Sequence, residues 1–180
     1  MGDAPRVGYV ISDLHMFSKR SESRVYEPAI YEFAAKANFF ILNGDTFDFR
    51  WTTLPSIDQT VYEAIAWLRN LVARFPKCHF HFILGNHDNN QAFVAALSKL
   101  VAKTDNLSWH PYYFRLGDSV FLHGDVSDKP MMGAAGLEKH REEWLLDTPK
   151  HAIYHSIYNM VVHLGLHRMA VPARYPNKRA

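Results

Sequence analysis

The sequence predicts an α/β fold with a mostly parallel sheet and flanking helices. Along the first half of the chain, short apolar runs alternate with segments of helical periodicity, an order typical of strand–helix–strand units. Further on, two short runs flank Gly117-Asp118, a dipeptide common in β-hairpins, which predicts an antiparallel edge to the sheet. The chain has 180 residues, the usual length of a single domain, so we expect one hydrophobic core.

The pattern predicts five strands and five helices. The strands are expected at Arg6–Ser12, Asn38–Leu42, Cys78–Leu84, Tyr112–Leu116 and Ser119–His123. The helices are expected at Glu27–Ala37, Ile57–Phe75, Gln91–Val101, Ala134–Leu146 and His151–Arg168. Ser56 and Gln59 predict a capping box in front of the second helix. In the third strand, His79 and His81 alternate with phenylalanines, which predicts one polar strand face.

Composition and charge exclude several classes of protein. The net charge of +2 is too small to indicate a protein that binds nucleic acid. From Thr148 onward the chain carries five basic residues and no acidic residue, which favours an anionic ligand, a membrane surface or a solvated face. The single cysteine, Cys78, excludes a disulfide framework and a thiolate metal site. Because no signal segment and no run of about 18 apolar residues is present, we expect a cytoplasmic protein.

Metal-binding residue types follow each strand of the first half and the hairpin. The clusters are Asp13-Leu14-His15, Gly44-Asp45-Thr46-Phe47-Asp48, Gly85-Asn86-His87-Asp88 and His123-Gly124-Asp125. Ligands of open α/β sheets bind beyond the carboxyl ends of the strands, so we expect these loops to converge on one crevice. Carboxylates and imidazoles without thiolates suit Mn²⁺, Fe²⁺, Co²⁺ or Zn²⁺ better than Ca²⁺. The three glycines are expected to relieve crowding beside the ligands.

The motifs Asp-x-His, Gly-Asp-x-x-Asp and Gly-Asn-His-Asp, in this order and each after a strand, resemble the signature of the calcineurin-like metallophosphoesterases. The resemblance covers about residues 6 to 125. It implies an αββα sandwich, with the N-terminal part of the core at 1–130 and a helical insertion or lid at 131–180. It also implies a hydrolase of phosphodiester or pyrophosphate bonds with two divalent metal ions, Mn²⁺ being expected first and Fe²⁺, Co²⁺ or Zn²⁺ being alternatives.

The resemblance implies a role for each residue of these clusters. Asp13 and His15 would bind the first metal, Asp45 would bridge both, and Asn86 and His123 would bind the second. His87 would be the catalytic histidine and Asp88 would orient it; Asp48 and Asp125 would support the ligands or simply cap loops, and Asp128 would bind substrate hydroxyls. The two cations would lower the pKa of a bridging water, which attacks phosphorus in line with the leaving oxygen.

The chain departs from the family pattern after His123. No Gly-His-x-His motif follows, although the family uses one such histidine for each metal, and the later sequence that forms most of the second sheet is also missing. Because every ligand up to residue 125 is present, we expect a fragment of a longer protein and not a degenerate site. His163 and His167, at the edge of an apolar helix face, are a less favoured substitute for the missing histidines.

Within the family, the segment Leu42–Phe49 (LNGDTFDF), with His-Gly-Asp and a helical insertion, is most similar to the UDP-2,3-diacylglucosamine pyrophosphatases of lipid A biosynthesis. This similarity implies a nucleotide-lipid or other phosphorylated small-molecule substrate, peripheral membrane contact through the C-terminal helix, and no specific nucleic acid. One alternative is a general phosphodiesterase or phosphomonoesterase acting on nucleotides. Another is a non-catalytic scaffold, such as one retromer subunit that resembles this fold, but an intact His87 argues against it.

Overall fold

The computed structural model describes residues 6–127 and 133–142, together with Ile157 and Met160. The chain divides into two compact units, Met1–Pro149 and Lys150–Ala180, and the fold below is that of the first. Asp128 and most of the helix expected at His151–Arg168 lie outside the described residues. Within the described part of the chain, no helix has the length and apolar character that crossing a membrane requires.

Four parallel strands form the main sheet, in the order β1-β2-β3-β4. They are β1 (Gly8–Ile11), β2 (Phe39–Asn43), β3 (His79–Ile83) and β4 (Leu107–His110). The register aligns their carboxyl ends, because Ile11 pairs with Leu42, and Ile83 pairs with both Asn43 and His110. The loops that follow β1, β2 and β3 therefore leave the sheet at one edge, as the sequence predicts.

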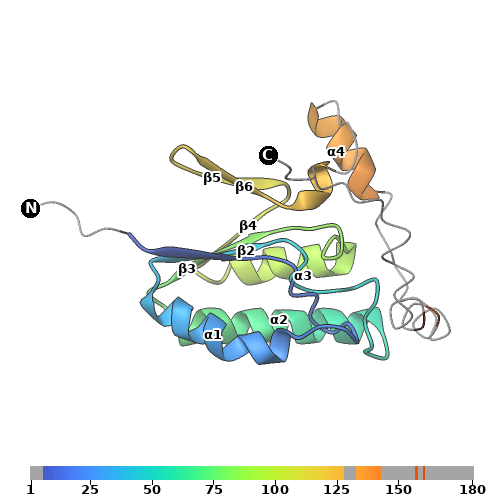
Figure 1. Cartoon of the computed structure of the whole chain (residues 1–180), viewed down its shortest axis with the longest axis horizontal. Helices are drawn as coiled ribbons and strands as arrows, with labels where there is room; N and C mark the ends of the chain where they lie inside the picture. Colours follow the sequence, from blue (N-terminus) through green and yellow to red (C-terminus); the bar gives the residue numbers. More distant parts are fainter. Residues whose placement is uncertain (1–5, 128–132, 143–156, 158–159, 161–180) are drawn as a thin grey trace, which may run out of the picture. The chain divides into compact units, whose positions relative to one another are not determined.

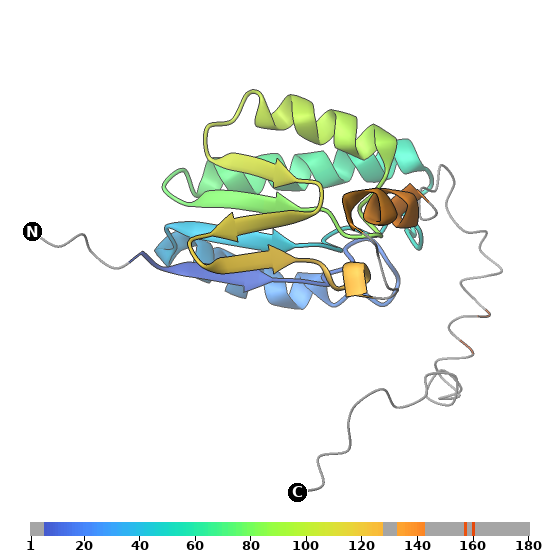
Figure 2. The ribbon, with the colours of Figure 1, turned by 90° about the horizontal axis from the view of Figure 1, so that it is seen from above.

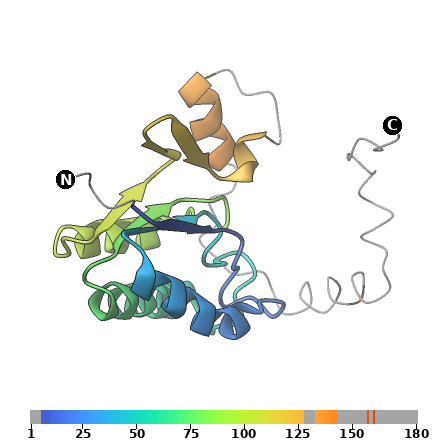
Figure 3. The same ribbon diagram turned by 60° about the vertical axis from the view of Figure 1, so that its left-hand side comes forward.

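Three helices cover one face of this sheet (Figures 1 and 3). They are α1 (Ser23–Lys36), α2 (Ile57–Arg74) and α3 (Gln91–Val101), each of which connects two neighbouring strands. Right-handed crossovers between strands in sequential order place successive helices on the same face, which accounts for this layer. Caps fix where two of them begin: Ser56 Oγ accepts from the Gln59 N–H at 3.1 Å, and Asn90 Oδ1 accepts from the Phe93 N–H at 3.1 Å.

The core between the sheet and the helices is rich in phenylalanine. Phe40, Phe80 and Phe82 point from β2 and β3 toward the helices and are almost fully buried. Leu68 of α2 and Leu97 of α3 are completely buried against them. Phe47 extends the core beneath the loop after β2, where it stacks on Phe82 at 6.0 Å. The metal-binding clusters are thus carried by loops whose bases are packed into the core.

The hairpin lies on the opposite face of the sheet from the helices (Figure 2). Its strands, β5 (Tyr113–Leu116) and β6 (Ser119–Leu122), are antiparallel and form a separate sheet, so the prediction that they extend the edge of the parallel sheet is wrong. Pro111, which follows β4 directly and has no N–H, ends the ladder of the parallel sheet, and the contact of Phe114 with His81 holds the hairpin over the sheet. A 3-10 helix, η1 (Gly124–Ser127), and the helix α4 (Gly133–Glu142) follow.

The hairpin covers the histidine face of β3. The rings of His81 and Phe114 stack with centroids 3.8 Å apart and an interplanar angle of 18°. His110 of β4 lies beside them, with its Nε2 3.3 Å from His81 Nδ1. This face is therefore half-buried between two sheets.

The largest differences from the predicted elements concern α1 and β4, while the other predicted elements that lie wholly within the described residues differ by at most two residues at either end. Helix α1 begins at Ser23, earlier than the predicted Glu27, and contains Pro28 in its interior. Strand β4 was not predicted, although the alternation in Leu107-Ser108-Trp109-His110 is a strand signal. The helix predicted at Ala134–Leu146 is observed as α4, and its expected last turn lies outside the described residues.

Candidate metal centre

The loops after β1 and β2 run side by side and extend the pairing of the two strands. The backbone N–H of Asp13 donates to the Gly44 carbonyl at 3.2 Å, and that of His15 donates to the Asp45 carbonyl at 2.8 Å. Met16 continues the series with a bond to the Thr46 carbonyl at 2.9 Å. These backbone bonds bring the Asp-x-His and Gly-Asp-x-x-Asp motifs together before any side chain is considered.

Three of the predicted ligands have left-handed backbone conformations. The φ angles are +58° for Asp13, +44° for His15 and +51° for Asp45. The left-handed backbone conformation costs a non-glycine residue about 1–3 kcal/mol, and residues strained in this way are concentrated at functional sites. The surrounding backbone bonds hold these residues in place, which indicates that the positions of the side chains matter more than the local cost.

Four of the five predicted metal ligands meet at the carboxyl edge of the sheet. Asp13, Asp45 and His123 each offer one ligand atom, and these atoms all lie within 4.8 Å of one another. His15 Nε2 faces the same group, 3.7 Å from Asp45 Oδ2 and 3.9 Å from Asp13 Oδ1. The side chains come from the loops after β1 and β2 and from the end of the hairpin, so three chain segments form the group.

Asn86, the fifth predicted ligand, lies in the neighbouring loop after β3. It is half-buried, and the next residue, His87, donates its backbone N–H to Asp45 Oδ1 at 2.9 Å. The loop after β3 is therefore tied to the central carboxylate. Asp13 and Asn86 lie at the same edge of the sheet, because both follow the carboxyl ends of parallel strands.

Asp48 connects two imidazole rings. Its Oδ2 lies 3.2 Å from His15 Nδ1 and its Oδ1 lies 3.0 Å from His87 Nδ1. Asp48 is buried and also accepts the Trp51 N–H at 2.7 Å, so its own position is fixed. The ligand atoms of His15, Asp48 and His87 lie close enough together to hold a metal ion. Their short distances are explained equally well by one carboxylate that orients two imidazole rings. With its Nδ1 on Asp48, His15 directs Nε2 toward Asp45.

The structure corrects the prediction for Asp88. Its carboxylate accepts three backbone N–H groups, from Phe47 at 2.7 Å and from Thr46 and Gly85 at 3.2 Å. Asp48, and not Asp88, lies against the His87 ring. The fully buried Asp88 carboxylate instead connects the loops after β2 and β3 by hydrogen bonds, because a carboxylate can accept several backbone donors at once.

Contacts between the carboxylates and imidazoles of this site shift their pKa values and stabilise their charged forms. Burial alone would raise the pKa of Asp45, but a hydrogen bond from His123 and the nearby charge of His87 outweigh it and lower that pKa. Burial would likewise lower the pKa of His123, yet the contact with Asp45 raises it to about 9. For His15, the bond to Asp48 and the charge of Asp45 overcome burial and raise the pKa. Asp88 differs, since burial and the charge of Asp45 raise its pKa to about 7.

Two of the three glycines are required by close approach. A Cβ on Gly85 would overlap the Asp45 carboxylate, and a Cβ on Gly44 would overlap the His123 ring, with the Gly44 φ of +81° adding strain. For Gly124 the expectation is wrong, because, besides its chain neighbours, none of the residues that the structure describes lies within 4 Å of an added Cβ. Gly44 and Gly85 therefore shape a cradle around the Asp45–His123 contact.

One contributor was missed by sequence reasoning. The backbone carbonyl of Asn43 lies 3.1 Å from His123 Nδ1, which turns the other ring nitrogen, Nε2, toward Asp45 Oδ2 at 3.2 Å. No side-chain signal could have indicated it, because the contact uses the main chain. Asp125 is buried in η1, and its charge helps to raise the pKa of His123. Asp128, His163 and His167 lie outside the described residues.

The donor set fits divalent cations. The carboxylates of Asp45 and Asp48 stay negatively charged although buried, because the pKa of each is lowered by imidazole contacts. A cation would be stabilised by these charges and would take the place of protons on the imidazoles. Carboxylate, amide and imidazole donors together suit first-row divalent metals.

The comparison with protein families agrees with this geometry. The model of the calcineurin-like phosphoesterases matches residues 9–170, most of the chain, including every loop that contributes to the candidate centre. No curated protein matches the chain. From the extent of the family match and the groups of side chains that could hold metal ions, the chain belongs to the calcineurin-like phosphoesterase family and is a metal-dependent phosphoesterase.

Proposed function

We propose that the protein hydrolyses a phosphodiester or pyrophosphate bond with the help of two divalent cations. Mn²⁺ is the metal that we expect first. The ligands of the proposal are Asp13, His15, Asp45, Asn86 and His123. The observation that carries it is the position of Asp45, whose Oδ2 lies 3.2 Å from His123 Nε2 and 3.7 Å from His15 Nε2. A carboxylate between imidazoles of different loops is suited to bridge two ions.

When bound, the cations supply Lewis acidity toward the phosphoryl group and toward a water molecule. The side chains of the protein do the positioning. Asp48 holds His15 Nδ1, so that Nε2 faces Asp45 and would be available to a cation, and the Asn43 carbonyl does the same for His123. Asp45 is itself held by the His87 N–H, so the central carboxylate cannot rotate away.

His87 is the catalytic histidine of this proposal. Its Nδ1 lies 3.0 Å from Asp48, and its ring meets the His15 ring edge-on with centroids 4.7 Å apart. A ring anchored through Nδ1 presents Nε2 to the substrate, where it donates a proton to the leaving oxygen or stabilises charge on the phosphoryl group. Asp48 orients it, which is the role that the sequence predicted for Asp88.

UDP-2,3-diacylglucosamine is the substrate that the similarity of Leu42–Phe49 supports, which would place the reaction in lipid A biosynthesis. Release of UMP from this compound, against no release from a nucleotide diester, tests that assignment. The reverse result would favour a general nucleotide phosphodiesterase. Peripheral membrane contact through the helix expected at His151–Arg168 stays a prediction, since that segment lies outside the described residues.

Hydrolysis of bis(4-nitrophenyl) phosphate tests the proposal itself. We expect turnover that depends on added Mn²⁺, disappears with a chelator and falls sharply in His87→Ala. Asp105→Asn, which changes an exposed carboxylate in the turn before β4, is the matched control and should behave like the wild type. Metal binding without any turnover would contradict the proposal and favour a non-catalytic scaffold.

A further inference from the structure

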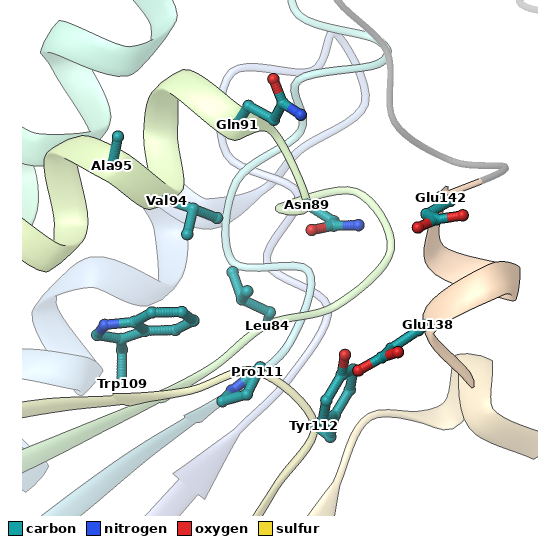
Figure 4. Close-up of a pocket in the computed structure, with 10 residues that line it drawn as sticks. All are labelled: Leu84, Asn89, Gln91, Val94, Ala95, Trp109, Pro111, Tyr112, Glu138 and Glu142. Carbon is teal, nitrogen blue, oxygen red and sulfur yellow. The ribbon is translucent and has the colours of Figure 1, made fainter. Parts of the chain in front are cut away.

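A cavity of about 510 Å³ lies beyond the end of β4, next to the loop that carries Asn86 and His87. Leu84, Val94, Trp109 and Pro111 give it apolar walls, and Figure 4 shows Glu138 and Glu142 extending from α4 toward it on the other side. None of the roles assigned above involves these walls. The volume suits an organic group of drug-like size.

Two lining residues of the cavity lie close in the chain to residues of the candidate metal centre. Leu84 precedes Gly85, which touches Asp45, and Asn89, another lining residue, follows His87 by two positions. The Leu84 N–H also donates to the His110 carbonyl at 3.0 Å, which fixes this wall to the end of β4. Since neighbouring strands are about 4.8 Å apart, the end of β4 lies about 10 Å from that of β2, where Asp45 stands. One substrate can therefore reach both places.

Among the described residues, the charged side chains that line the cavity are all acidic. Of the lining residues that the structure describes, two are glutamates and none is basic. Glu138 and Glu142 are one helical turn apart, so both carboxylates leave the same side of α4. In Figure 4 the Tyr112 side chain points toward Glu138, so an aromatic ring and a carboxylate stand at the same wall. Aromatic rings and carboxylates together favour a cationic group and disfavour an anionic one.

We propose that this cavity receives the organic group of the phosphoester and that Glu138 and Glu142 are specificity-determining residues that exclude a negatively charged group. A group with an apolar body and a cationic nitrogen binds best, an uncharged group of the same shape binds less well, and an acid binds worst. The inference rests on the proposed hydrolysis for the orientation of the substrate. It adds the charge of the organic group that the cavity would hold.

Both glutamates are exposed, so the selectivity is modest. Solvent-exposed charge pairs and cation–π contacts each contribute little individually, and together they predict a roughly three- to tenfold step in kcat/KM between successive charge states. The step should shrink as ionic strength rises, because exposed charges are screened within about 10 Å at 0.1 M salt.

Three chromogenic diesters of one length test the order. They are the 4-nitrophenyl phosphates of choline, of 3,3-dimethylbutanol, which replaces the cationic nitrogen by carbon, and of 4-hydroxybutanoate. We expect kcat/KM to fall in this order for the full chain with Mn²⁺. In the double variant Glu138→Gln/Glu142→Gln the three values should converge to within about twofold, because the selecting charges are gone. The double variant Asp105→Asn/Asp118→Asn removes the same charge from two exposed turns and should keep the wild-type order.

Binding of phenyltrimethylammonium, followed by calorimetry, separates this inference from the proposed hydrolysis. Saturable binding to the wild type that is lost in Glu138→Gln/Glu142→Gln supports the cavity assignment even if no ester is hydrolysed. If the esters are hydrolysed at equal rates and the cation does not bind, the inference is overturned while the hydrolase proposal stands. Absence of both hydrolysis and cation binding overturns both.

Discussion

His123 Nε2 lies 3.2 Å from Asp45 Oδ2, a contact that ties the end of the hairpin to the loop after β2. Asp45 follows a strand of the parallel sheet and His123 follows a strand of the hairpin sheet, so their contact depends on how the hairpin packs over the parallel strands. Phe114 makes that packing, through its stack on His81. The site and the fold are therefore coupled: a change beneath the hairpin is expected to reach His123, and through it Asp45.

His87→Ala should retain bound metal and lose catalysis. A positioned proton donor or charge stabiliser contributes roughly 10²–10⁴-fold, so we expect a fall in kcat of that size with little change in manganese content. Steady-state kinetics and elemental analysis on the same preparation measure both. Asp48→Asn should differ, because it frees His15 as well as His87 and so lowers metal affinity too. Near-normal turnover in His87→Ala would remove the residue from the mechanism.

Gly85→Ala should disturb the metal centre, whereas Gly124→Ala should not. The new methyl group at 85 overlaps the Asp45 carboxylate, while the one at 124 meets open space. For Gly85→Ala we expect a stability loss of about 1–3 kcal/mol, typical of an overpacked site, together with weaker Mn²⁺ binding. Thermal denaturation and metal titration compare the two variants. Equal behaviour would mean that Asp45 can move without consequence.

Asp88→Ala should destabilise the protein more than any exposed aspartate does. Three backbone donors, of Thr46, Phe47 and Gly85, lose their acceptor in a fully buried place. Because each unsatisfied buried donor costs roughly 1–3 kcal/mol, we expect a loss of about 3 kcal/mol or more in urea unfolding. Asp105→Ala, an exposed position, is the control and should change stability very little. A loss of activity at unchanged stability would instead return Asp88 to a catalytic role.

The histidine face under the hairpin predicts a pH effect on stability. Burial, helped by the charges of His79, His110 and Arg6, lowers the pKa of His81 to about 4. The unfolded chain takes up a proton near pH 6.5 and the folded protein only near pH 4, so stability is lost as the pH falls between these values. His15 and His123, whose pKa values are raised, act in the opposite direction.

The variant His81→Phe isolates this effect, because phenylalanine keeps a ring against Phe114 but does not titrate. Relative to the wild type, it should become more stable by about 1 kcal/mol between pH 7 and pH 5, a value reduced for the half-exposed ring. Urea unfolding at several pH values provides the comparison. A difference between variant and wild type that is constant with pH would show that His81 does not titrate in this range.

Local chemistry determined much of what the sequence could predict. The bounds of α3 and the cap at Ser56 agree with the structure, because helix periodicity and side-chain caps act within a few residues. The four clusters were found because a parallel sheet brings the ends of its strands together. Long-range packing decided the rest. Whether the hairpin joins the sheet or lies over it depends on contacts such as His81 with Phe114, which no local pattern contains.

Within the site, residue types were predictable and partners were not. The choice of Asp48 over Asp88 beside His87 follows from backbone conformations, including the left-handed Asp45, that the sequence does not reveal. The contact between the Asn43 carbonyl and His123 is also invisible in a sequence, since every residue has a carbonyl.

The number of manganese ions per chain tests the central claim, that Asp45 serves two cations, most directly. The wild type, Asp45→Ala and Asn86→Ala would be loaded with Mn²⁺ and desalted, and the manganese content per chain would be measured by elemental mass spectrometry. A bridging carboxylate predicts about two ions for the wild type, almost none for Asp45→Ala and about one for Asn86→Ala. Equal losses in the two variants, or wild-type content in Asp45→Ala, would contradict the account.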